Sequence, residues 1–130
     1  FFPTFVKAAG GKPKGAGPID GVDLMPILKG KEKLEREALY WHYPHYSNQG
    51  GFPGSAVRIG EWKLIERFED GKTHLYDLSK DIGERNDVAD KHPDRVNAMR
   101  QKLHEWYKEV DAKFLQAKKS DGPQPWRPAR

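Results

Sequence analysis

An apolar stripe near the end of the chain constrains the fold more than any other feature of the sequence. Its members recur at three- and four-residue spacing: Val96, Met99, Leu103, Trp106, Tyr107, Val110 and Phe114. This period places them on one face of an α-helix, and Pro93 suits the first turn of such a helix. We predict a helix over residues 93–117 whose stripe packs against another element of the same chain rather than a partner.

The middle of the chain supplies that element. Residues 38–43, 56–59, 62–68 and 73–78 are rich in aromatic and β-branched residues, which favour strands. Gly60 and Glu61 can form a tight hairpin turn, because glycine tolerates a positive φ. The fold class that we expect is α+β, with a small antiparallel sheet of about four strands packed against a long C-terminal helix.

Changes of composition divide the chain into three parts. Residues 2–9 have helical apolar spacing, and a Gly/Pro/Lys-rich loop and a short apolar turn follow them. We expect residues 1–34 to be the end of a larger domain with a connector, residues 35–119 to be the sheet-and-helix subdomain, and residues 120–130 to be an extended tail. Because the chain opens on Phe1 rather than methionine, we expect an excised piece.

Composition argues against several classes of protein. The net charge is +4, and Lys and Arg alternate with Asp and Glu, so we do not expect nucleic-acid binding. No stretch approaches the ~18 apolar residues that span a bilayer, so we expect no membrane segment. The sequence contains no cysteine, which excludes disulfides and thiolate metal sites within it.

An aromatic segment, residues 41–46, carries the best candidates for ligand contact. It places His42 and His45 beside Pro44 and among three aromatic rings, those of Trp41, Tyr43 and Tyr46. The two imidazoles could donate hydrogen bonds to an anionic or hydroxyl-rich ligand, or lie hydrogen-bonded inside an aromatic cluster. A metal site is disfavoured, because these positions face opposite sides of a strand and no acid is adjacent. The rings themselves could stack on sugar or aryl groups, or belong to the core.

Arg58 is the predicted strand cation nearest this segment. Its planar guanidinium could pair with a sulfate or carboxylate, or form an ordinary salt bridge. A nucleophilic site is hard to build from the remaining residues, since the serines have no nucleophile-elbow context and no phosphate-binding loop is present. The chain by itself therefore does not predict an enzyme.

Four phrases, in order along the chain, nevertheless resemble one family. They are Phe2-Pro3-Thr4-Phe5, the segment 20–30, Leu75-Tyr76-Asp77-Leu78, and Asp81-Ile82-Gly83-Glu84, in which Ile82 replaces the usual proline. On these phrases the chain resembles the C-terminal subdomain of a type I sulfatase, a formylglycine-dependent, arylsulfatase-like hydrolase of sulfate esters. By this resemblance, residues 1–34 are the remnant of the end of the catalytic domain.

The resemblance implies a parent enzyme with a formylglycine and a calcium ion, but neither has a matching position here. No catalytic or metal-binding residue is therefore assigned in this chain. The implied partners are the catalytic domain of the same polypeptide and a sulfated carbohydrate or aryl sulfate. Such enzymes are often exported, so the resemblance implies a periplasmic or extracellular location.

The role implied for the chain is to support the catalytic domain and to line part of its substrate pocket. We expect His42 and His45 to contact substrate, with Tyr46 and Arg58 as further candidates. The isolated piece is expected to be inactive and could self-associate through an apolar patch. Two alternatives remain open, a stand-alone carbohydrate-binding or protein-interaction module and a degenerate sulfatase that has lost its nucleophile.

Overall fold

The computed structural model describes residues 1–15, 17, 19–30, 36–48, 50–116 and 124–128. It divides into two compact units, Phe1–Arg36 and Glu37–Arg130. The second unit contains the sheet and the long helix, and it carries every residue that the sequence singled out for ligand contact.

The first unit contains two short helices, α1 (Phe2–Ala8) and α2 (Met25–Leu28). Gly10, two residues after the end of α1, adopts the left-handed conformation (φ 77°) that glycine tolerates just past a helix end. The two helical segments are joined by the Thr4 side chain, whose Oγ1 accepts a hydrogen bond of 2.9 Å from the backbone N–H of Leu24.

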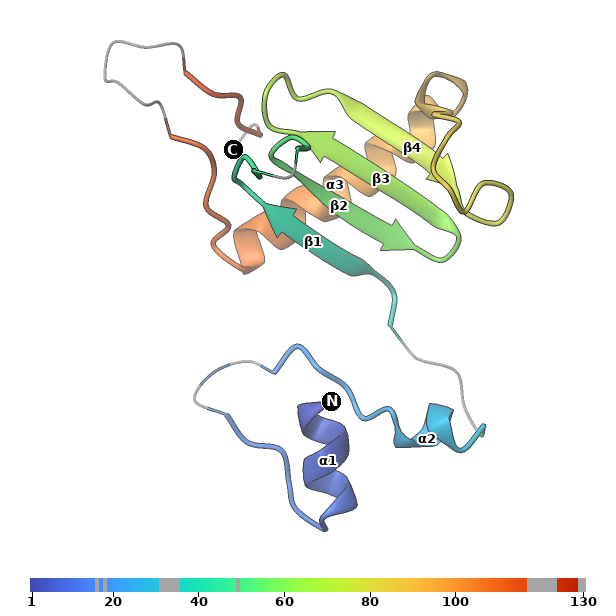
Figure 1. Ribbon diagram of the computed structural model, residues 1–130, viewed down its shortest axis with the longest axis vertical. Helices are drawn as coiled ribbons and strands as arrows, with labels where there is room; N and C mark the ends of the chain where they lie inside the picture. Colours follow the sequence, from blue (N-terminus) through green and yellow to red (C-terminus); the bar gives the residue numbers. More distant parts are fainter. Residues whose placement is uncertain (16, 18, 31–35, 49, 117–123, 129–130) are drawn as a thin grey trace. The chain divides into compact units, whose positions relative to one another are not determined.

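The second unit is built on a four-stranded antiparallel sheet. Its strands are β1 (Leu39–Tyr43), β2 (Gly54–Ile59), β3 (Trp62–Arg67) and β4 (Thr73–Asp77). Each strand pairs with the next one along the chain, in the order β1-β2-β3-β4 (Figure 1). The predicted sheet is confirmed, and Gly60 takes the positive φ of 57° that the β2–β3 turn requires.

Helix α3 (Pro93–Glu109), preceded by the 3-10 turn η1 (Ala89–Lys91), lies across one face of this sheet (Figure 1). The predicted α+β class, an antiparallel sheet on a C-terminal helix, is therefore confirmed. The core lies between helix and sheet and consists of Val57, Leu64, Phe68, Leu75, Met99, Leu103 and Tyr107.

The helix is shorter than the apolar stripe predicts. It ends at Glu109 instead of continuing to residue 117, because Asp111 adopts a left-handed conformation with φ 49°. The N–H of Ala112 then bonds to the carbonyl of Tyr107 at 2.9 Å, which turns the chain back. Phe114 still packs against the core, because this turn, and not a continued helix, directs its side chain there. Residue 117 lies outside the described residues.

The loop between β4 and α3 is organised by two carboxylates, those of Asp81 in the Asp81-Ile82-Gly83-Glu84 phrase and of Asp87 just after it. Asp81 accepts hydrogen bonds of 2.7 Å from the N–H groups of Arg85 and Asn86. Asp87 accepts bonds of 3.0 Å from two backbone N–H groups, those of Leu75 in β4 and of Ala89 in η1. Asp87 thereby fixes the start of the helical region to the sheet.

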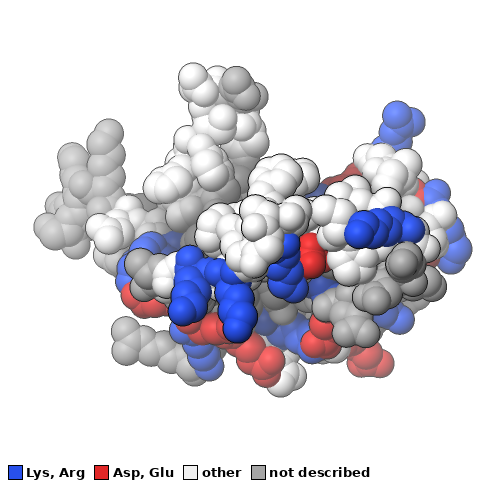
Figure 2. All heavy atoms as spheres, turned by 90° about the horizontal axis from the view of Figure 1, so that it is seen from below, with Lys and Arg blue, Asp and Glu red and all other residues white. Residues whose placement is uncertain are grey.

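Charges of both signs alternate on the surface. On the face shown in Figure 2, Lys and Arg are mixed with Asp and Glu and do not form one continuous patch. Among the described helices, none is both long and apolar enough to cross a bilayer.

Candidate functional site

Alternate residues of each strand point to opposite faces of the sheet, and α3 packs on one of the two faces. On β1, Tyr40 faces the helix and stacks on Trp106, with ring centroids 4.8 Å apart. Trp41 and Tyr43 face the other way and are 49% and 54% exposed. We call this second surface the open face, because no described helix of the sheet-and-helix unit covers it (Figure 1).

The strand register arranges the open face in rows that cross the sheet. The middle row is mostly apolar and contains Trp41, Ala56, Ile65 and His74. The rows on either side carry cations, and each cation has an acidic partner in the same unit. Arg58 lies 3.8 Å from Glu61, Lys63 lies 2.6 Å from Glu84, and Arg67 lies 2.5 Å from Glu69. The open face thus carries an apolar middle row, and the cations in the rows beside it are neutralised by acidic partners.

A shallow hollow of about 270 Å³ lies on this face. It is lined by Trp41, Tyr43, Phe52, Gly54, Ser55, Ala56, Lys63 and Ile65. Gly54 leaves room for close strand pairing, because a Cβ there would lie 2.7 Å from the carbonyl oxygen of Glu66. The hollow is therefore bounded by aromatic rings, and the strands β2 and β3 beneath it are closely paired.

Arg67 lies at the edge of the hollow and joins the strands to the loop after β1. Its guanidinium carbon lies 4.8 Å from the centre of the Phe52 ring, a cation–π contact. Its partner Glu69 also accepts a hydrogen bond of 3.1 Å from the hydroxyl of Tyr46. Within the described part of the chain, the buried Nε of Arg67 has no hydrogen-bond acceptor, and the nearest carboxylate oxygen is that of Asp70 at 3.6 Å.

His42 does not lie on the open face. Its side chain points to the helix side, where its ring is surrounded by Phe68, Trp106, Tyr107 and Phe114. Its Nε2 is 2.6 Å from the carbonyl of Lys113 and its Nδ1 is 2.7 Å from the hydroxyl of Ser55. A carbonyl only accepts, so Nε2 donates, and in the neutral ring Nδ1 then accepts from Ser55. Both ring nitrogens are thus used inside the molecule.

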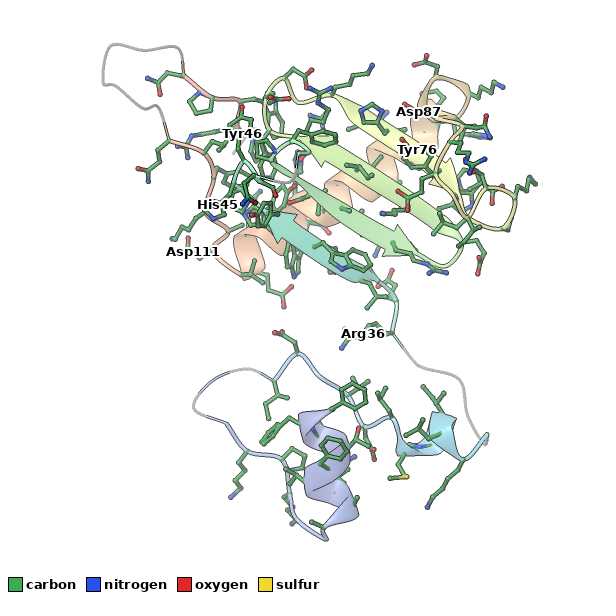
Figure 3. The ribbon with its side chains drawn as sticks, in the orientation of Figure 1. Arg36, His45, Tyr46, Tyr76, Asp87 and Asp111 are labelled. Carbon is green, nitrogen blue, oxygen red and sulfur yellow. The ribbon has the colours of Figure 1, made fainter. Side chains whose placement is uncertain are left out.

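His45 and Tyr46 are exposed in the loop that follows β1, and Figure 3 shows them beyond the end of that strand. The His45 ring meets the Tyr43 ring edge-on, with centroids 5.5 Å apart. The hydrogen bond to Glu69 stabilises the protonated phenol of Tyr46 and raises its pKa above the ordinary value. His45 therefore lies against a residue that lines the hollow, and Tyr46 is bonded to the acid that pairs with Arg67.

Arg58 lies elsewhere on the sheet. It pairs in register with Leu39, at the opposite end of β1 from Tyr43, and its Nε donates to the carbonyl of Gly60 at 2.9 Å. Arg58 is the strand cation that the sequence places nearest the aromatic segment. The structure shows a second one, Arg67, which lies against Phe52 and shares Glu69 with Tyr46.

Sequence reasoning missed a buried polar cluster around Glu66, on the helix side of the sheet, which we call the Glu66 cluster. Glu66 is fully buried and accepts hydrogen bonds from Arg100 Nε (2.7 Å), His104 Nε2 (2.9 Å) and the Tyr107 hydroxyl (3.1 Å). Burial raises the pKa of Tyr107, so its phenol stays protonated and donates. The sequence did contain a signal for this cluster. Glu66 is two residues from Leu64 and so lies on the same face of β3, and its donors Arg100, His104 and Tyr107 recur at helical spacing.

The described residues do not provide a metal site. Among them no three His, Asp or Glu side chains come together as a ligand set, and the sequence has no cysteine. The described residues therefore do not supply the ligand set that a calcium ion needs.

Comparison with known proteins identifies the family. Residues 1–114 match the model of a family described as N-sulphoglucosamine sulphohydrolase, C-terminal. The chain belongs to this family. It corresponds to the C-terminal portion of a sulfatase, as its motifs predicted.

Two curated relatives agree with this assignment. A sulfatase from Formosa agariphila is 30% identical over 121 residues, which cover 82% of this chain and 22% of that protein. Human arylsulfatase A is 33% identical over 127 residues, covering 76% of this chain and 24% of the human protein. The sulfatase portion described here thus spans less than a quarter of the length of these relatives.

Solved structures show the same correspondence. BT4656, solved in complex with its substrate D-glucosamine-2-N,6-O-disulfate, superposes with a TM-score of 0.69 and is 27% identical, covering 84% of this chain and 23% of that one. BT1596, a 2-O GAG sulfatase, superposes with a TM-score of 0.70 at 25% identity, covering 85% and 24%. The sheet-and-helix arrangement is therefore shared with enzymes that act on sulfate groups.

Proposed function

We propose that this chain completes a sulfuric ester hydrolase by docking on the catalytic portion of the same polypeptide and lining part of its substrate pocket. The observation that carries the proposal is the open face, which leaves Trp41 and Tyr43 half exposed beside a hollow. An antiparallel sheet can leave a polar face in water, but an apolar face is normally buried against other chain. The relatives have more than three quarters of their length outside the matched region, which provides such chain.

The residues that contact substrate in this proposal are His45 and Tyr46. Both are exposed, and both can form hydrogen bonds to sulfate or sugar hydroxyl groups. His45 meets the ring of Tyr43, which lines the hollow, and Tyr46 bonds to Glu69, the partner of Arg67. His42 acts as a positioning residue, because its ring nitrogens hold the end of β1 against the segment after α3. Arg58 takes no direct part, since it lies at the far end of the strand with its own partners.

The substrate class that we propose is a sulfated carbohydrate, with aryl sulfates as artificial substrates. The support comes from the relatives, one of which was solved with a disulfated glucosamine. Formylglycine and calcium would be supplied by the catalytic portion, where they would provide a nucleophile and a Lewis acid for sulfate-ester hydrolysis. We also infer from the family that the parent is exported to the periplasm or the extracellular space, which cell fractionation would test.

The first experiment is to read the coding sequence upstream of Phe1 in the same frame. A Cys/Ser-x-Pro/Ala-x-Arg motif preceded by acidic metal ligands is the expected result. A start codon just before Phe1, or a complete upstream domain without that nucleophile, would overturn the proposal. In parallel, the 130-residue chain alone is expected to release no sulfate from 4-methylumbelliferyl sulfate.

The role of the exposed loop is tested in the full-length enzyme with a sulfated disaccharide. His45→Ala is expected to raise KM about tenfold or more, on the scale of a lost hydrogen bond to a charged group. Tyr46→Phe keeps the ring and should have a smaller effect. His92→Ala is the matched control, because His92 is also exposed but lies at the opposite end of the sheet, against Trp62. Equal effects of His45→Ala and His92→Ala would contradict the assignment.

A binding module is the second candidate function, and the exposed rings of Trp41, Tyr43 and Tyr46 favour it. In that case the isolated chain would bind uncharged sugars saturably. Titration of the 130-residue chain with neutral oligosaccharides distinguishes the two, since the docking proposal expects no such binding.

A further inference from the structure

The last described residues, 124–128, return to the sheet-and-helix unit (Figure 1). They place the indole of Trp126 on Phe68, with ring centroids 6.1 Å apart and ring planes only 12° from parallel. The same indole lies 6.3 Å from the His104 ring, and its centre is 5.7 Å from the guanidinium carbon of Arg100. Trp126 therefore fills a slot between the end of β3 and helix α3.

Gly71, in the turn between β3 and β4, forms another wall of this slot. Its φ is +71°, and a Cβ built there would lie 2.2 Å from Nε1 of Trp126 and 2.5 and 2.7 Å from two ring carbons. Real Cβ atoms do not approach other atoms so closely. The indole thus occupies the space that any other residue at position 71 would need for its side chain.

A second contact holds the same segment in place. Nη2 of Arg127 donates a hydrogen bond of 3.0 Å to the carbonyl of Leu115, in the segment after α3. The family model matches only residues 1–114, so both Trp126 and Arg127 lie beyond the part that the family model describes. The slot walls, in contrast, all lie within the matched residues.

The slot lies directly over the Glu66 cluster. Arg100 and His104, which the indole contacts, are the two cationic or imidazole donors to the fully buried Glu66. Their side chains are 35% and 21% exposed, whereas Glu66 is inaccessible. A ring that excludes water from these donors strengthens their electrostatic interaction with the carboxylate.

We propose that the slot formed by Phe68, Gly71, Arg100 and His104 is a binding site for an aryl ring, and that the chain fills it with its own Trp126. Residues 124–128 then act as a strap that closes the Glu66 cluster and holds α3 on the sheet. The ligand class is an indole flanked by proline and arginine, as in Gln124-Pro125-Trp126-Arg127-Pro128. This inference is independent of the proposed enzymatic function.

The slot can be tested by emptying it. In the full 130-residue chain, Trp126→Ala is expected to lower the urea midpoint of unfolding. A peptide with the sequence of residues 124–128, acetylated and amidated, should then bind saturably and raise that midpoint with its concentration, because a ligand of the folded state stabilises it. The same peptide with alanine for tryptophan should do neither. An unchanged midpoint in Trp126→Ala, or equal effects of the two peptides, would overturn the proposal.

A second experiment uses the close approach at Gly71. Gly71→Ala should lower the urea midpoint strongly in the unaltered chain and less in the Trp126→Ala background, where the clash has gone and only the positive φ remains. Gly60→Ala is the matched control, since Gly60 also has a positive φ but nothing within 4 Å of its Cβ position. Its effect should be the same in both backgrounds. Equal losses from Gly71→Ala in the two backgrounds would show that the indole does not occupy the slot.

Discussion

Glu66 is fully buried between the sheet and α3, yet it carries a carboxylate. Burying an ionised group costs several kcal/mol unless hydrogen bonds and an opposite charge compensate it. Here Arg100 provides the charge, and His104 and Tyr107 complete the set of donors. Because all of these donors project from one helix, the cluster also fixes the rotation of α3 relative to the sheet.

Glu66→Gln should therefore destabilise the chain although it changes few atoms. The amide cannot accept from all of the donors, and Arg100 loses its counter-charge, so we expect a loss of about 2–4 kcal/mol in the free energy of unfolding. Urea unfolding followed by circular dichroism measures it. Glu105→Gln, an exposed change on the same helix, is the control and should alter stability little. A similar, small effect of both variants would contradict this role of Glu66.

The contacts of Asp87 predict how the stability of the chain changes at acidic pH. Burial alone would raise the pKa of Asp87, but the N–H groups of Leu75 and Ala89 and the His74 ring together lower it below its ordinary value. Above the unfolded pKa of about 3.9 this stabilisation is fully present. As the pH falls through the folded pKa, the unfolded state takes up the proton first and stability is lost. Asp87→Asn should flatten this acid-side loss in urea midpoints measured from pH 5 to pH 2, and an unchanged slope would contradict it.

At the scale of the elements, two glycines support the sheet for different reasons. Gly60 forms the β2–β3 turn with φ 57° and open space around it, whereas Gly54 lies in β2 with the Glu66 carbonyl 2.7 Å from its Cβ position. Gly60→Ala should lower the free energy of unfolding by about 1–2 kcal/mol, because alanine is strained in the left-handed conformation. Gly54→Ala should cost more, because a backbone oxygen of a paired strand cannot move cheaply. Thermal unfolding of the two variants compares them, and a greater loss for Gly60→Ala would contradict the argument.

The elements were predictable because their apolar periods are distinct. Strand composition and the glycine turn locate β2 and β3, and the 3.6-residue stripe locates α3. The end of α3 was not predictable from the stripe, because Phe114 keeps the period although Asp111 has already left the helix. A core contact made through a turn cannot be distinguished from a helical one by spacing alone.

The candidate site was only partly predictable for a related reason. Strand parity places His42 on the same face as Tyr40, but which face the helix covers depends on tertiary packing. Likewise Arg67 is farther from the aromatic segment in sequence than Arg58, yet it shares Glu69 with Tyr46. A loop residue such as His45 belongs to no periodic pattern, so only the structure shows that its ring meets Tyr43, which lines the hollow.

At the scale of the whole chain, each unit exposes apolar side chains that small soluble domains usually bury. In the first unit Phe2 and Phe5 are 52% and 66% exposed, and in the second the open face exposes Trp41 and Tyr43. Both surfaces are consistent with a chain that spans less than a quarter of its relatives' length. The sheet-and-helix unit is thus complete on its helix side and incomplete on its open face.

The isolated chain should therefore self-associate through the open face, where large rings surround an apolar row. Replacing two of these rings, in the double variant Trp41→Ser and Tyr43→Ser, is expected to shift the chain toward monomer without lowering its urea midpoint much, because neither side chain packs on α3. Val110→Ser is the matched control, since Val110 is 46% exposed and follows the end of the helix instead. Sedimentation velocity over a range of concentrations measures the association. If the control reduces it as much as the double variant does, the open face is not the associating surface.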